Sequence, residues 1–119
     1  MLDMPFRSAV QLAAAIRARE IGCRELLDLY LARIERFNSK LNAIIATAFP
    51  AARKRADAAD ADLARGKIWG KLHGVPMTIK ESFDVIGMPT ASASAVTARS
   101  SVTARRDTTI SCSTHLRPA

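Results

Sequence analysis

The chain has 119 residues, enough for one small domain or for a piece of a larger one. Its composition is that of an ordinary globular protein, with 49% hydrophobic and 24% charged residues. It contains no apolar run of about 18 residues that would cross a membrane. The first residues lack the pattern of a secretory signal, so we expect a cytoplasmic protein. The two cysteines, Cys23 and Cys112, are far apart and favour neither a disulfide framework nor a metal site.

The net charge is +7 and the pI is near 10.3. Residues 91–119 carry four arginines against one aspartate, whereas residues 1–90 carry 14 basic and 10 acidic residues. A basic nucleic-acid-binding protein is therefore one alternative. The basic residues of the predicted helices are interleaved with acidic ones, however, and no aromatic platform accompanies them. Nucleic acid is accordingly not the favoured partner.

Two amphipathic helices are predicted first. Ser8, with Gln11 three residues later, fits a capping box and opens a helix over residues 8–20, with Gly22 as its C′ residue. A second helix is predicted over residues 24–37. The brief turn between the two helices favours an α-hairpin.

Cys23 precedes the second predicted helix. A helix N-terminus lowers the pKa of a thiol, so a reactive cysteine is one interpretation. A small, partly buried residue is the favoured one.

Residues 38–40 are predicted to form a turn and residues 41–45 a strand. Phe49-Pro50 then opens a third helix, since proline suits the first helical turn, and this helix is expected to stop at Gly66. Its apolar face is narrow. The residues predicted to face water are Arg53, Lys54, Arg55, Asp57, Asp60 and Asp62.

The most informative stretch is residues 72–90, LHGVPMTIKESFDVIGMPT. Apolar residues alternate from Val75 to Lys80, which predicts a short strand with Pro76 near its start. Lys80 then stands at the C-terminal end of the strand, where α/β enzymes place working groups. Partial burial would lower the pKa of such a lysine and make it a usable base. The pattern by itself favours the alternative, a solvated lysine.

The segment from Gly74 to Val85, followed by Gly87-Met88-Pro89-Thr90, resembles the lysine segment of the amidase signature family. Family members commonly have Leu-x-Gly-Val/Ile-Pro-x-x-Ile/Val-Lys-Asp/Glu-x-x-Asp-Val-x-Gly-x-Pro-Thr there. The rhythm of residues 34–43 is also similar, so the resemblance covers about residues 8–90. It implies hydrolysis or transfer of amide groups by a Ser–cis-Ser–Lys triad. Lys80 would be the triad lysine, which takes a proton from the bridging serine.

The resemblance implies an α/β fold, in which a helical lead-in is followed by the first strands of a mixed sheet sandwiched by helices. Residues 1–90 would be the N-terminal part of this domain. It implies a small-molecule amide as substrate, and we expect no cofactor and no metal. Glu81 stands where many members have aspartate, and Asp84 matches an aspartate that we interpret as structural. Neither the amide nor the choice between a simple amidase and a tRNA-dependent amidotransferase follows from the sequence.

Residues 91–119 depart from the family. They are dominated by alanine, serine, threonine and arginine, and we expect them to be disordered or out of frame. Members continue into a Gly/Ser-rich loop that supplies the serines and oxyanion N–H groups, but this sequence has no glycine after Gly87. Ser100-Ser101 lacks flanking glycines and is not assigned. We hypothesise a lost reading frame after Thr90 or a truncated chain, and hence an inactive fragment.

Two further interpretations concern the loop before Lys80 and the function as a whole. His73 has alternatives as a base, a ligand or a turn residue, and without a second histidine before His115 we interpret it as structural. Trp69 is expected to pack under the loop of residues 67–71. Besides the amidase and the nucleic-acid-binding protein, a helical interaction protein that pairs with an intact amidase stays an alternative.

Overall fold

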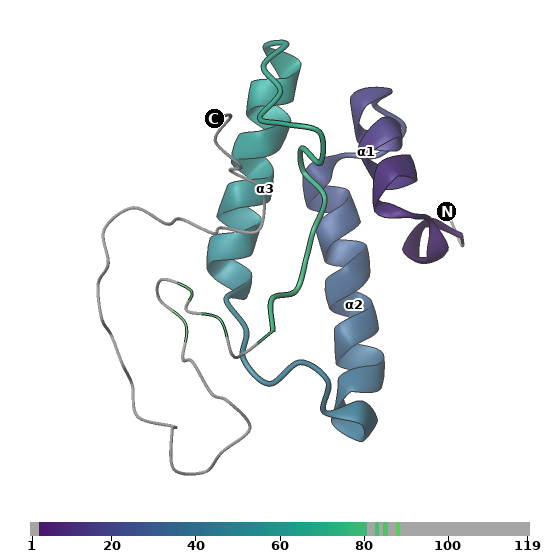
Figure 1. The fold of residues 1–119 in the computed structure, drawn as a ribbon, viewed down its shortest axis with the longest axis vertical. Coiled ribbons are helices and arrows are strands. Elements are labelled where there is room, and N and C mark those ends of the chain that lie inside the picture. Colours follow the sequence, from purple (N-terminus) through teal and green to yellow (C-terminus); the bar gives the residue numbers. More distant parts are fainter. Residues whose placement is uncertain (1–2, 81–82, 84, 86–87, 89–119) are drawn as a thin grey trace.

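The computed structural model describes residues 3–80, 83, 85 and 88. A short 3₁₀ helix, η1 (Met4–Phe6), precedes three α-helices, α1 (Ala9–Arg17), α2 (Cys23–Leu41) and α3 (Phe49–Ala64). The most extensive helix packing joins α2 to α3, and α1 lies near the first turns of α2 (Figure 1). The expected hairpin of the first two helices is therefore replaced by a pairing of the second with the third. The predictions for Glu81, Asp84, Ser100-Ser101 and residues 91–119 lie outside the described residues.

The start of α1 confirms the predicted capping box. The Ser8 hydroxyl accepts from the Gln11 N–H at 3.3 Å, and the Gln11 side chain accepts from the Ser8 N–H at 2.8 Å. The helix ends at Arg17, earlier than expected, because Arg19 has a φ of 59° and turns the chain. The N–H groups of Arg19 and Glu20 donate to the carbonyls of Ile16 and Ala15, which is a Schellman motif.

Gly22 is thus not a C′ residue but the N-cap of α2. This helix is longer than predicted, since residues 38–40 are helical and not a turn, and it ends where Asn42 takes a left-handed φ of 47°. The predicted strand over residues 41–45 is also wrong. The Asn38 side chain donates to the Ile44 carbonyl and accepts from the Ile44 N–H, both at 2.9 Å. These bonds occupy both backbone groups that a neighbouring strand would need at that residue.

Helix α3 begins and ends as predicted, and Gly66 takes the left-handed φ of 77° that stops it. Its buried face is made of alanines, Ala56 and Ala59, which lets α2 approach closely. Arg53 and Asp57, predicted to face water, also pair across to α2: Arg53 contacts Asp28 at 3.0 Å, and Asp57 contacts Arg24 at 2.8 Å.

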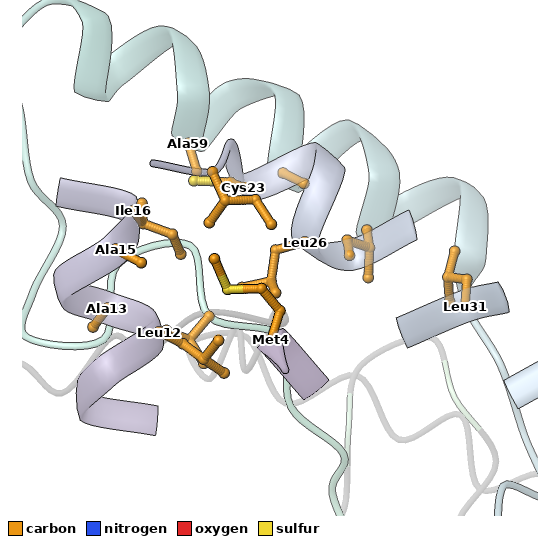
Figure 2. Close-up of a cluster of buried hydrophobic side chains, with 13 residues drawn as sticks. Met4, Leu12, Ala13, Ala15, Ile16, Cys23, Leu26, Leu31 and Ala59 are labelled. Carbon is orange, nitrogen blue, oxygen red and sulfur yellow. The ribbon is translucent and has the colours of Figure 1, made fainter. Parts of the chain in front are cut away.

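The core lies where the helices meet. Side chains of η1, α1 and α2 converge there and Ala59 of α3 closes one side (Figure 2). Cys23 and Leu26 are completely buried at its centre. Val75, from the segment that follows α3, is also buried and belongs to this core. The loop before Lys80 is therefore packed on the helices.

The predicted strand over residues 75–80 is irregular in the structure, and no strand is found among the described residues. The described part is helical, so the sheet of the predicted α/β fold is not seen. A strand needs a neighbouring strand about 4.8 Å away with unpaired backbone groups. The neighbours of this segment are α2 and α3, which satisfy their own backbone groups within each helix (Figure 1).

Candidate functional site

Lys80 stands at the end of the irregular segment that leaves the core at Val75. Val75 is 5% exposed, whereas Met77 and Lys80 are exposed. Pro76 lines a small cavity together with Leu27 of α2 and Ala56 of α3, which places the start of the segment between these helices. The described residues do not desolvate Lys80. The burial that would make it a base is therefore not present in this part of the chain.

The loop before Lys80 is attached to all three α-helices. From α1, the Arg17 guanidinium donates to the Lys71 carbonyl. From α2, Cys23 lies against Gly74, where an added Cβ would collide with its sulfur. From α3, the carbonyl of Ala59 is bonded to the His73 ring at 3.1 Å. Residues 71–75 thus have a fixed position on the helical body.

His73 holds the centre of this loop. It is completely buried, its Nδ1 accepts from the Trp69 N–H at 3.1 Å, and its Nε2 lies 3.1 Å from the Ala59 carbonyl oxygen. Since Nδ1 accepts a hydrogen bond, Nε2 carries the proton and donates it to Ala59. This arrangement fits the structural interpretation of His73 and uses both ring nitrogens.

Trp69 packs between α3 and His73, as predicted for a residue under the loop. Its indole N–H donates to Asp62 at 2.6 Å, the Arg55 guanidinium lies 3.7 Å from the ring centre, and its ring meets His73 edge-on at 5.1 Å. Hydrogen bonds from Arg65 and from Trp69 lower the pKa of Asp62 to about 2. Asp62, expected to face water, instead fixes the tryptophan.

Asp60 was also predicted to face water, and it caps α2 from the neighbouring helix. Its two carboxylate oxygens accept from the N–H groups of Cys23 at 2.7 Å and Arg24 at 3.0 Å. Two of the unpaired N–H groups at the start of α2 are thereby satisfied. The contact joins residues 37 and 36 positions apart, so no local sequence pattern could have indicated it.

Burial, and next the hydrogen bond and charge of Asp60, raise the pKa of the Cys23 thiol to about 12. A buried, protonated thiol is a poor nucleophile, so the structure supports the second interpretation of Cys23, a buried core residue.

The part of the chain that the structure describes contains no group of three or more histidine, cysteine or acidic side chains that could hold a metal ion. No helix in the same part of the chain is both long enough and apolar enough to cross a membrane.

Comparison with known proteins places the chain in a family. The family model described as Amidase matches residues 25–110, more than half of the chain. The chain belongs to the amidase family. It is 45% identical over 82 residues to an indoleacetamide hydrolase of Bradyrhizobium diazoefficiens, covering 69% of this chain and 16% of that protein. It is 43% identical over 84 residues to a glutamyl-tRNA(Gln) amidotransferase subunit of Halorhodospira halophila, covering 71% and 17%.

An amidase of Pseudomonas putida is 37% identical over 84 residues, covering 71% of this chain and 18% of that protein. The chain therefore spans about a sixth of the length of these amidase-family relatives. The family match also runs past Thr90, where the composition changes, to residue 110.

Proposed function

We propose that the chain is the N-terminal segment of an amidase-type hydrolase that acts on carboxylic amide bonds, and that Lys80 is the lysine of its Ser–cis-Ser–Lys triad. The observation that carries the proposal is the gap-free lysine motif from Gly74 to Val85 inside a family match. In this mechanism Lys80 accepts a proton from the bridging serine. That serine takes the proton of the nucleophilic serine, which attacks the amide carbonyl and expels the amine.

The position of Lys80 suits a lysine that meets its partners from elsewhere in an enzyme. It is exposed at the end of a segment whose start is packed on three helices. The serines among the described residues are Ser8, which caps α1, and Ser39, which lies in the last turns of α2. Neither has the glycine-rich surroundings of an amidase serine. The 119 residues by themselves are therefore proposed to be inactive.

The substrate class follows from the family. The similar proteins are named as an indoleacetamide hydrolase, an amidase and a glutamyl-tRNA(Gln) amidotransferase, and an amide group is common to these names. We propose a small carboxylic amide as the substrate. Indoleacetamide is the first compound to test, because the relative named for it is 45% identical over 82 residues.

A chimera tests the proposal. The matched segment of the Bradyrhizobium indoleacetamide hydrolase is replaced by the matched residues of this chain, and ammonia release from indoleacetamide is measured. The chimera is expected to be active, and Lys80→Ala should lower kcat by about 10³-fold or more, as loss of one triad member does in other hydrolases.

Lys71→Ala is the matched control, since Lys71 is another exposed lysine nine residues earlier whose carbonyl contact survives the change. It should keep kcat within about twofold, because a solvated lysine away from the chemistry contributes little. An active chimera that tolerates Lys80→Ala as well as Lys71→Ala would show that Lys80 is not the triad lysine.

A further inference from the structure

Among the described residues, His73 is the one polar residue that is buried, with 0% of it exposed. A buried imidazole must have both nitrogens satisfied, and the two partners here are both backbone groups. The Trp69 N–H can only donate and the Ala59 carbonyl can only accept. A single neutral tautomer, with the proton on Nε2, satisfies both.

The two partners belong to different parts of the molecule. Trp69 lies in the same loop, four residues before His73, whereas Ala59 lies on α3, 14 residues away. The bond to Trp69 closes the loop on itself, and the bond to Ala59 fastens that closed loop to the helical body. We propose that His73 is a positioning residue for Lys80, which holds the loop of residues 69–75 on α3 and so fixes where the lysine segment leaves the helices. This inference rests on the proposed role of Lys80.

The neighbouring residues support a fixed direction. Gly74 has a φ of 74° and lies against Cys23, and Val75 is buried directly after it. Val75 is also the last buried residue before Lys80. The turn that His73 holds is therefore the point at which the chain leaves the core.

Small errors at this point are large at the lysine. Five residues separate Val75 from Lys80, a reach of up to about 17 Å. A rotation of about 10° at the turn would move the far end by roughly 3 Å, whereas a catalytic group must be held within about 0.5 Å. Misplacement of a reacting group by about 1 Å can cost about 10²-fold in rate. Loosening the loop should therefore lower the rate of the chemical step without removing any substrate contact.

Two substitutions separate the two hydrogen bonds. His73→Gln can place its amide nitrogen near the position of Nε2 and keep the bond to Ala59. His73→Asn keeps an acceptor near the position of Nδ1 and loses the bond to Ala59. In the active chimera, we expect His73→Asn to lower kcat by about 10-fold or more while KM changes less than about threefold. His73→Gln should recover kcat to within about threefold of the unsubstituted chimera, with all rates compared well below each variant's Tm.

The tautomer is measured separately in the complete 119-residue chain from the ¹⁵N shifts of the imidazole. The expected result is the neutral ring with its proton on Nε2. A proton on Nδ1, equal losses of kcat in the two variants, or no loss in either would overturn the inference. The proposed function fails separately, when the unsubstituted chimera is inactive or ignores Lys80→Ala. A chimera that needs Lys80 and ignores His73 overturns the positioning role alone.

Discussion

Gly74→Ala is the substitution whose cost can be worked most directly from the structure. Gly74 has a φ of 74°, a conformation that costs an L-residue about 1–2 kcal/mol. An alanine Cβ would also collide with the Cys23 sulfur and lie 3.1 Å from the Cys23 Cβ and 3.4 Å from Ile16 Cδ1. Overpacking of this kind adds about 1–3 kcal/mol. The expected loss in the free energy of unfolding is about 2–5 kcal/mol.

Gly66→Ala is the matched control. Gly66 has nearly the same φ, 77°, but no atom lies within 4 Å of the position that its Cβ would take. It should lose only the backbone share, about 1–2 kcal/mol. The difference between the two variants therefore measures the contact of Gly74 with Cys23.

The assay is urea unfolding of the full chain followed by helical circular dichroism, with sulfate added to lengthen the native baseline. Cys23→Ala removes the colliding sulfur, so Gly74→Ala should cost about 1–2 kcal/mol less in that background. Equal losses for Gly74→Ala and Gly66→Ala, with no coupling to Cys23→Ala, would refute the packing of this loop on α2.

Three further outcomes follow from the contacts of α3. Asp60→Ala should destabilise the chain by about 0.5–2 kcal/mol in urea unfolding, because it uncaps α2, and by more than Asp57→Ala, which removes an exposed ion pair; equal losses would contradict the capping role. Cys23, with a pKa of about 12, should react with iodoacetamide at pH 8 at least about 100-fold more slowly in the native chain than in urea, as followed by peptide mass spectrometry, and equal rates would contradict its burial. The folded chain keeps this thiol proton while the unfolded chain loses it, so the free energy of unfolding should fall as pH rises from about 9 toward about 12. The Asp62 carboxylate, with a pKa of about 2, stabilises the fold above its ordinary value of 3.8, and this contribution should be lost as pH falls toward about 2, with Trp69 fluorescence as the probe; fluorescence that stays constant over this window would contradict the bond between them.

Local patterns predicted the helix boundaries that are made locally. The capping box of Ser8 and Gln11 acts within one turn, and so do Pro50 at the start of α3 and Gly66 at its end. The end of α1 was missed because Arg19 occupies the left-handed position that glycine usually takes. The end of α2 was missed because Asn38, which suits a turn, is helical and bonds Ile44 instead.

The site depends on contacts that are distant in the sequence. Lys80 was found through its motif, and the structure adds that its segment is held by His73 and Gly74. The partners of these residues, Ala59 and Cys23, are 14 and 51 positions away, and no periodicity indicates them. The alternation over residues 75–80 predicted a strand, but alternation specifies only two faces, and a ladder also needs a partner strand.

Chemical rescue tests the central claim, that Lys80 is the triad base, most directly. The Lys80→Ala chimera is assayed for ammonia release from indoleacetamide with and without added small primary amines, beside the Lys71→Ala chimera. The account predicts that the amines raise the rate of Lys80→Ala by about 10-fold or more, in proportion to the free-base concentration, and leave Lys71→Ala unchanged. A Lys80→Ala chimera as active as Lys71→Ala, or an equal response of both variants to the amines, would contradict it.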